Sequence, residues 1–587
     1  MIGTERKGVL VNRKFYQYLG PMLLSELAIS LNEFVDGIIV SQLLGSDAMS
    51  MVGMASPVMY VFAVIYIILG VGGSAAYAEY SGMQKKEKAD KLFSVVFASS
   101  VGISAFIATV GMICLRPLAS LMCADTVILP EFTSYLAVTI ISGVLIIPLQ
   151  VLINCFAAFG YPQIGTKLNL AANAINLVMD YVFIHYFHTG VKGAAMATFS
   201  GYLIALIWFI LLLPGRKVSV PLRKISLKDV VLVREAAGKG VAMSLNQLGY
   251  AIKTFFGNSL SMTLAGIEGV TIFTLCMQSI SIISIAMGGV VEAMVPIGAA
   301  LKGQKDYKGI KILLRTAMIA QFIACLVCTA GVELFPQIFR YMYNYSGADT
   351  AAADLGIRIF SLVFIFRGFV LIFMYYFQIV SRKLYASFVS IYDGFAGLIP
   401  IAMILTGAFG IRGLWMAFPA VSLSELIIII LANLYISAHS GGKYHGLLLV
   451  ETEDESVPVY DVTVQLDTED ISDTVVSLQR FCESNDVDQR TSVMMALSLE
   501  EMISYMLDNK EHSISCDEVD ILAKIREDNI MMDIRSIGMP LDPTTAPVSE
   551  YSNVEVLKKV AQKLEYTYVV GMNQTRIMVR RDCEARS

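Results

Sequence analysis

Residues 132–159 read FTSYLAVTIISGVLIIPLQVLINCFAAF, and residues 164–187 read IGTKLNLAANAINLVMDYVFIHYF. Each stretch is longer than the about 20 apolar residues that cross a bilayer as a helix. The first contains no charged residue, whereas the second carries Asn176 and Asp180, which are four residues apart and lie on one face of the predicted helix. Because an ionisable side chain at membrane depth costs several kcal/mol, it indicates an ion or substrate pathway.

The composition of the whole chain is typical of a membrane protein. Of its 587 residues, 56% are hydrophobic and 16% are charged, and the mean hydropathy is +0.64. Soluble enzymes of this length rarely reach such values. The net charge of -5 conceals a division, because residues 1–443 carry +10 and residues 444–587 carry -15. A basic membrane body therefore precedes an acidic soluble segment.

Twelve apolar segments follow one another along the basic part. The sequence therefore predicts an all-α polytopic membrane protein with twelve transmembrane helices, followed by a small C-terminal α/β soluble domain. The predicted spans are 15–43, 52–80, 92–115, 132–159, 164–187, 193–213, 240–264, 269–300, 312–335, 355–380, 385–408 and 413–437.

The spans form two sets of six, because short motifs recur about 220 residues apart. The recurring pairs are Gly190–Gly193 with Gly410–Gly413, Gly72–Gly73 with Gly288–Gly289, and Ser81–Gly82 with Lys302–Gly303. A repeat of six helices keeps its orientation, so we expect two bundles around a central cavity. The predicted domains are an N-terminal six-helix bundle at 1–214, a C-terminal six-helix bundle at 215–440, a linker at 441–458 and the soluble domain at 459–587.

The charges of the loops predict how the chain lies in the membrane. Loops on the cytoplasmic side of a membrane protein carry an excess of Lys and Arg. If Met1 is inside, most basic loop residues are inside too, and the exceptions are Arg116, Lys192, Arg340, Arg358 and Arg412. We therefore predict a multi-pass protein of the cell (plasma or inner) membrane, with both termini in the cytoplasm.

Four motifs, in this order and with this topology, resemble the MATE family of multidrug and toxic compound extrusion transporters, in particular its DinF-like branch. They are Glu33–Gly37 (EFVDG), Ala158–Pro162 (AFGYP), Asn176–Ile184 (NLVMDYVFI) and Gly193–Thr198 (GAAMAT). The resemblance covers residues 10–440. It implies a cation site for Na+ or H+ in the N-terminal half, formed by Asp36, Asn176, Asp180 and Thr198.

Two carboxylates, an amide and a hydroxyl supply only oxygen ligands, which suits Na+ or a proton. The alternative is that Asp36 and Asp180 are structural and bond to other groups within the bundle. Glu33 lies on the same span and is a candidate for tuning the charge of the site. A second carboxylate site, present in the NorM-like branch, requires an acidic residue in span seven, where this chain has Asn246 and Gln247. We therefore expect that site to be absent.

The C-terminal half carries other charges within predicted spans, including Lys253, Arg367 and Asp393. One interpretation is internal ion pairing of Lys253 or Arg367 with Asp393. The other is a cavity that holds an anionic group of the substrate. Unpaired cations facing a cavity would repel the lipophilic cations that many MATE proteins export.

The resemblance implies an antiporter, not an enzyme, that exports small organic compounds or drugs by alternating access and is coupled to Na+ or H+. No other cofactor and no nucleic acid is expected, and the partners are a small-molecule substrate and membrane lipid. Two alternatives remain open. One is a flippase for lipid-linked saccharides or polysaccharides of the same superfamily, and the other is a membrane sensor that signals through the soluble domain.

The soluble domain resembles the histidine-kinase-like ATPase fold of anti-sigma-factor kinases. The motifs are Ala496–Glu501, Gly538–Pro543 and Leu557–Tyr566. The sequence predicts strands at 459–466, 521–527, 531–537, 566–570 and 576–580, and helices at 473–483, 490–508 and 554–564. Tyr505, Ser536 and the segment 552–556 depart from the nucleotide-binding residues of that family. We therefore expect a degenerate domain without ATP turnover, which could bind a regulatory protein.

Overall fold

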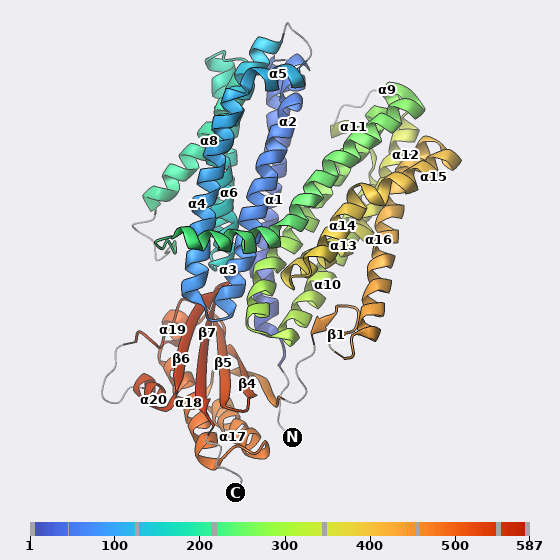
Figure 1. Ribbon diagram of the computed structural model, residues 1–587. Coiled ribbons are helices and arrows are strands. Elements are labelled where there is room, and N and C mark those ends of the chain that lie inside the picture. The colour runs from blue at the N-terminus through green and yellow to red at the C-terminus, as the bar shows by residue number, and fades with distance from the viewer. Residues whose placement is uncertain are drawn as a thin grey trace.

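The computed structural model describes residues 6–44, 46–123, 128–212, 220–342, 349–442, 444–451, 457–546 and 553–581. In these ranges the chain forms a helical membrane body and a small α/β domain at one end of it (Figure 1). The N-terminal half of the body is blue to cyan in Figure 1, the C-terminal half is green to yellow, and the α/β domain is orange to red.

The N-terminal bundle consists of six long helical segments within the described residues. The second continues from α2 through the π-helix η1 into α3, and the fifth continues from α7 into the π-helix η2. The bounds are α1 (Val9–Leu44), α2 (Ser46–Tyr66), η1 (Ile67–Val71), α3 (Gly72–Gly82), α4 (Lys86–Ile113), the short α5 (Leu115–Met122), α6 (Leu129–Ala158), α7 (Pro162–Tyr181), η2 (Val182–Tyr186) and α8 (Val191–Leu212).

The C-terminal bundle repeats this pattern. Its first two segments form one continuous element, α9, which changes direction at Ala265 and Gly266, where the backbone leaves the helical conformation. The bounds are η4 (Leu227–Val230), α9 (Val231–Gly303), α10 (Tyr307–Leu334), α11 (Gln337–Met342), α12 (Thr350–Ser361), α13 (Val363–Ile379), α14 (Lys383–Ile391), η5 (Tyr392–Ala396), α15 (Leu398–Phe409) and α16 (Ile411–His439).

Within the described residues, nine helices are both long and apolar enough to cross a membrane. The other three predicted spans correspond to α1, α7 and the first half of α9, which are helical but interrupted by polar side chains. These three helices carry Asp36, Asp180 and Lys253, respectively. The predicted fold class is confirmed, and each of these three less apolar helices carries a candidate site residue.

The two bundles are in close contact at the end next to the soluble domain, where repeated glycines of α3 and α9 meet. A Cβ atom on Gly82 would overlap the carbonyl oxygen of Ala300, and one on Gly303 would overlap that of Glu79. Only glycine permits such close backbone packing. Across the same contact, Glu79 pairs with Lys302 at 2.9 Å. At the opposite end the bundles diverge (Figure 1).

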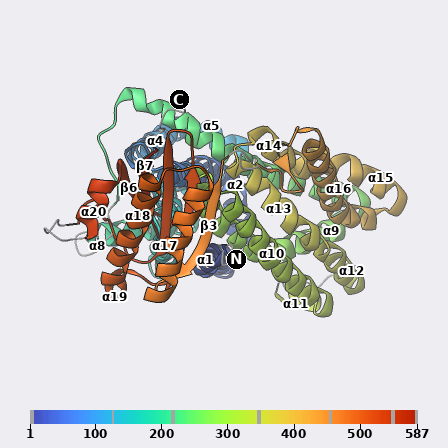
Figure 2. The same ribbon diagram turned by 90° about the horizontal axis from the view of Figure 1, so that it is seen from below.

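The soluble domain contains a five-stranded antiparallel sheet in the order β3-β4-β5-β7-β6. Helices α17 and α18 cover the face that lies away from the membrane body (Figure 2). The bounds are β3 (Val459–Gln465), α17 (Thr468–Ser484), α18 (Gln489–Asp508), α19 (Lys510–Ser513), β4 (Glu518–Ile525), β5 (Asn529–Ile537), α20 (Asn553–Val560), β6 (Lys563–Val569) and β7 (Met572–Arg580).

The predicted elements are present with shifted bounds, since α17, β4, β6 and β7 each begin three to five residues before the predicted position. The helix predicted at 554–564 ends at Val560, and Lys563 already begins β6, because its residues pair with β7. Strand pairing of this kind overrides local helix propensity. The predicted linker contains a short hairpin of β1 (Tyr444–His445) and β2 (Val450–Glu451), whereas residues 443 and 452–456 lie outside the described residues.

The second face of the sheet is polar and packs against the membrane body. A cluster of four buried charges, the interdomain ion cluster, joins the two parts and consists of Arg6, Asp306, Asp520 and Arg535. The Arg6 guanidinium donates to Asp306 at 2.6 Å and to Asp520 at 3.0 Å, and Arg535 donates to Asp306 as well. Burial alone would raise the pKa of Asp306, but the two arginines outweigh it and hold this pKa well below its usual range.

A second contact joins the turn between β6 and β7 to the N-terminal bundle. The backbone N–H of Val570 donates to the carbonyl oxygen of Ala158 at 3.2 Å. Gly571, with a φ of +69°, packs against Gly160, where a side chain would not fit. The soluble domain therefore contacts the N-terminal bundle here and the loop between α9 and α10 through Asp306.

Candidate functional site

The candidate cation site lies inside the N-terminal bundle, where α1, α7 and α8 pack together. Asp180 of α7 is fully buried, and its carboxyl group interacts directly with that of Asp36 on α1. Asp180 stands next to η2, and π-helical turns are frequent at functional sites. Both carboxylate oxygens of Asp180 and Oδ1 of Asp36 are buried without a hydrogen-bond partner among the described residues.

Asn176 and Thr198 belong to the same group of side chains. Asn176 lies one helical turn before Asp180 and is 4% exposed. Its Nδ2 donates to Oγ1 of Thr198 at 3.3 Å, and this hydroxyl in turn donates to the carbonyl oxygen of Ala194 at 3.2 Å. The hydroxyl proton and the amide N–H are therefore used within the protein, which leaves the amide oxygen as an acceptor. All four predicted residues lie in this part of the bundle.

From the sequence, Tyr135 of α6 is a candidate for lining the cavity of the N-terminal half, but the sequence does not place it at this site. Its side chain is nearly buried and interacts electrostatically with both Asp36 and Asp180. A tyrosine within an apolar helix carries no signal of such a role, since its contact with α1 and α7 depends on how the helices pack. The side chain of Glu33, a candidate for tuning the charge of the site, lies outside the described part of the structure.

This arrangement can bind a small cation. Two carboxylates that interact in a buried site oppose joint ionisation, and a proton or a cation relieves the repulsion. Among the described residues, neither Asp36 nor Asp180 is paired with a Lys or Arg side chain. Oxygen ligands are those that hard cations prefer. The orphaned oxygens are therefore available to a small cation or to a proton.

The buried charges of the C-terminal bundle are arranged differently. Nζ of Lys253 lies 2.8 Å from Asp393, and Nη1 of Arg367 lies 2.6 Å from the other oxygen of the same carboxylate. Arg367 also lies 3.9 Å from Glu425 and donates to Oδ1 of Asn246 at 2.7 Å. This is the internal ion pairing that the sequence offered as one interpretation. The same cations line a cavity of about 520 Å³, which is lined by this bundle and, on its other side, by residues of α1 and α2.

A second pair of acidic residues lies between the bundles. Glu26 of α1 and Glu292 of α9 interact directly with each other and line a central cavity of about 320 Å³. The lining also includes two tyrosines and several amides, namely Tyr66, Tyr375, Gln150, Asn154 and Gln247. Because Glu26 also lines the C-terminal cavity, the two cavities adjoin. The sequence shows each acid singly, but only the packing of α1 against α9 reveals the pair.

The sequence of the membrane body is similar to that of known proteins. Residues 21–182 match the MatE family. The multidrug export protein MepA of Staphylococcus haemolyticus (strain JCSC1435) is 20% identical over 394 residues, which cover 67% of this chain and 86% of that protein. MepA of Staphylococcus aureus (strain NCTC 8325) is 21% identical over 423 residues, which cover 70% and 92%, respectively.

Solved structures show the same fold. An outward-facing multidrug resistance MATE family transporter of the MOP superfamily superposes with a TM-score of 0.68 at 22% identity. A MOP superfamily transporter from Pyrococcus furiosus, for which a reversed polarity of the binding pocket suggested a different function, gives 0.67 at 22% identity. Each match covers 74% of this chain and 99% of the other. The predicted resemblance to the MATE family is confirmed, whereas the likeness of the soluble domain to ATPases stays a prediction.

Proposed function

We propose that this chain, whose membrane body has the MATE fold and includes a MatE family match, is a cation-coupled exporter of small organic compounds. Its relatives are named multidrug export proteins, which supports drug export as the class of activity. One observation carries the coupling to a cation. The carboxyl groups of Asp36 and Asp180 meet inside the N-terminal bundle with buried oxygens that have no partner among the described residues.

The proposed mechanism is alternating access. Because the bundles diverge at the end away from the soluble domain and meet at Gly82 and Gly303, the arrangement corresponds to a state closed on the soluble-domain side. Na+ or H+ enters from the open side and binds between Asp36 and Asp180, which removes their repulsion and shifts α1 relative to α7. Each coupled charge gains about 2.3 kcal/mol per 100 mV of membrane potential. That energy allows roughly forty-fold accumulation of an exported neutral compound. When one cation is exchanged for one organic cation, no net charge moves, and the concentration gradient of the coupling ion supplies the energy.

The central cavity indicates the substrate class. Glu26 and Glu292 place two acidic groups beside aromatic rings, and both cations of the adjoining cavity are already bonded to Asp393. Acidic and aromatic side chains together attract organic cations. A lipophilic organic cation is therefore the proposed substrate.

A second candidate is export of an anionic lipid-linked saccharide. One observation favours it, since Lys253 and Arg367 line a cavity and could turn toward an anionic group. Their existing bonds to Asp393 argue against it, because each bond would have to be broken. Competition of ethidium efflux by organic cations or by saccharide phosphates distinguishes the two substrate classes.

The test uses ethidium efflux from cells or proteoliposomes with an imposed Na+ or pH gradient. Asp36→Asn and Asp180→Asn should each abolish gradient-driven efflux while the protein remains folded. Glu131→Gln, at an exposed position of α6, is the matched control and should retain efflux. Efflux driven by the gradient in both Asn variants would overturn the proposed site.

We also propose that both termini lie in the cytoplasm. The lysines at the end of α3 and α9, Lys85, Lys302 and Lys305, lie at the same end as the soluble domain, as expected for a cytoplasmic face. The orientation can be tested in intact cells with a single cysteine engineered into the soluble domain. A membrane-impermeant maleimide should not label this cysteine until the cells are lysed. Strong labelling before lysis would contradict it.

A further inference from the structure

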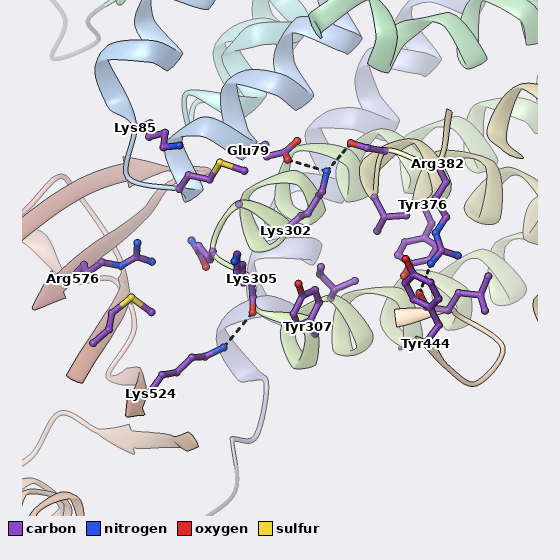
Figure 3. A pocket seen from close by; sticks show the side chains of 18 of the residues that line it. Glu79, Lys85, Lys302, Lys305, Tyr307, Tyr376, Arg382, Tyr444, Lys524 and Arg576 are labelled. Atoms are coloured by element: carbon purple, nitrogen blue, oxygen red, sulfur yellow. Dashed lines mark hydrogen bonds and ion pairs between the residues drawn. The ribbon is translucent and has the colours of Figure 1, made fainter. Parts of the chain in front are cut away.

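We infer that a basic pocket between the membrane body and the soluble domain binds a phosphorylated anion that carries several negative charges. The pocket has a volume of about 680 Å³, which is within the range of small-molecule sites. Figure 3 shows its lining side chains, which come from the ends of α3, α9 and α13 and from the sheet of the soluble domain. It is separate from the central cavity between the bundles.

The lining is strongly basic. Seven cations line the pocket, and Glu79 is the sole acidic residue among its described lining residues. The cations are Lys85, Lys302, Lys305, Arg382, Lys524, Arg526 and Arg576. Such an accumulation of like charges is unfavourable unless an anion neutralises it.

Internal ion pairs account for part of this charge. Lys302 pairs with Glu79 at 2.9 Å, and Arg576 forms a bidentate contact with Asp533 at 2.7 and 3.0 Å. In contrast, the described residues offer no ion-pair partner to Lys85, Lys305 or Arg526 (side chains exposed at the pocket). At least three positive charges therefore remain available to a ligand.

A phosphorylated ligand fits these side chains better than a carboxylate. A phosphoryl group offers several acceptor oxygens and more than one charge to lysine and arginine. Tyrosines beside the cations, including Tyr307 and Tyr444, supply aromatic faces, and the guanidinium of Arg382 lies 4.2 Å from the ring centre of Tyr444. Both a lipid phosphate and a soluble polyphosphate share this chemistry, and both can reach a pocket at the ends of the spans.

The pocket does not coincide with the face where the predicted ATPase-like motifs lie. Strand residues alternate between the two faces of a sheet. Lys524, Met531 and Met578 are direct neighbours on the face toward the membrane body, whereas α18, which carries Glu500 and Glu501, packs on the opposite face. Retention or loss of a nucleotide site on α18 therefore leaves the proposed pocket unaffected.

A ligand in this pocket would connect three parts of the protein. Lys85 belongs to the N-terminal bundle, Lys305 and Arg382 to the C-terminal bundle, and Arg526 to the soluble domain. An anion that bridges them favours the state in which the bundles meet at this end. Binding itself is independent of the proposed transport function, whereas its effect on the transport cycle rests on that function.

The test measures binding to the full-length protein in nanodiscs of phosphatidylcholine. Inorganic tripolyphosphate, ATP as a second probe, and nanodiscs containing phosphatidylglycerol represent the two sources of phosphate. We expect at least one of them to raise the midpoint of thermal unfolding in a concentration-dependent way. A soluble probe that acts in phosphatidylcholine indicates a soluble ligand, whereas retention of phosphatidylglycerol in native mass spectrometry, with no effect of the soluble probes, indicates a lipid.

The decisive variant combines Lys85→Gln, Lys305→Gln and Arg526→Gln, which removes the three available cations and breaks no ion pair among the described residues. Affinity should fall at least tenfold. The matched control combines Lys228→Gln, Lys311→Gln and Arg490→Gln, three exposed cations outside the pocket, and should bind like the native chain.

Equal loss of binding in both triple variants, or no response of the native protein to any of the three probes, would overturn the proposal. An Asp36→Asn, Asp180→Asn double variant separates this result from the proposed function. It should bind the anion normally even though coupled export is lost.

Discussion

The two bundles of this protein bury acidic residues in opposite ways. In the N-terminal bundle, Asp36 and Asp180 face each other, and the described residues place no Lys or Arg side chain in an ion pair with either. In the C-terminal bundle, Asp393 accepts from both Lys253 and Arg367. The halves share a fold, but among the described residues an uncompensated carboxylate pair lies inside the first bundle alone, since the other such pair, Glu26 with Glu292, lies between the bundles. A coupling cation therefore has a reason to bind in one bundle and not in the other.

The largest expected effect is the difference in stability between a variant that lacks the Asp393 carboxylate and one that lacks the Asp180 carboxylate. Asp393→Ala leaves two buried cations without their shared carboxylate, and breaking a buried ion pair in this way costs about 3–5 kcal/mol of stability. Asp180→Asn removes a repulsion, so it should leave the stability unchanged or increase it. Thermal unfolding of the purified variants in detergent provides the comparison.

Asp393→Asn serves as the control for volume in that experiment, because it keeps the shape but removes the charge. It should destabilise the protein nearly as much as Asp393→Ala. If Asp180→Asn proved as destabilising as Asp393→Ala, Asp180 would be a structural residue and the contrast between the bundles would fail.

The interdomain ion cluster extends the comparison to a buried carboxylate outside the membrane-spanning helices. Asp306 is held ionised by Arg6 and Arg535, so its pKa lies well below the ordinary value. A lowered pKa means that the stabilisation is fully present above the unfolded pKa of about 3.9 and is lost as the pH falls through the folded value. Docking of the soluble domain should therefore persist from neutral pH down to about pH 4 and weaken only below it.

Fluorescence transfer between dyes on the soluble domain and on α10 measures this docking. Asp306→Asn should weaken docking at neutral pH by about 3 kcal/mol, since it leaves two arginines uncompensated. The acid-induced loss should disappear in the same variant. An unchanged pH profile in Asp306→Asn would show that another group controls docking.

The sequence predicted the fold class and the shared helix face of Asn176 and Asp180, because apolar length and spacing within a helix are local properties. Placing Asp36 and Thr198 beside them required the resemblance to a family. The pairing of Glu26 with Glu292, the place of Tyr135 and the docking of the soluble domain depend on contacts between distant segments, which no local pattern encodes. The alternation of polar residues in β5 and β7 by itself predicts a solvated face, and only the structure shows that both faces are buried.

A smaller effect is expected at the central cavity, which Glu26 and Glu292 line between the bundles and where we propose that the substrate binds. Glu26→Gln should weaken the binding of ethidium about tenfold, which corresponds to about 1.4 kcal/mol. Glu131→Gln is the control, because it makes the same change from Glu to Gln at an exposed position outside the cavity. Binding measured by fluorescence anisotropy of ethidium separates affinity from transport, and an unchanged affinity would exclude Glu26 from the substrate site.

The smallest expected effect tests whether the contribution of an ion pair to docking depends on its burial or only on the pairing of its charges. Lys308 and Asp461 form an ion pair at 3.5 Å at the same interface as Arg6 and Asp306, but the Lys308 side chain is 43% exposed. Exposed pairs contribute about 0–1 kcal/mol, because water already solvates both charges. Lys308→Ala should therefore weaken docking far less than Asp306→Asn in the same fluorescence assay, and more strongly in low salt than in high salt. Equal effects of the two variants would mean that pairing, and not burial, decides the cost, and the contrast between the bundles would then need another physical explanation.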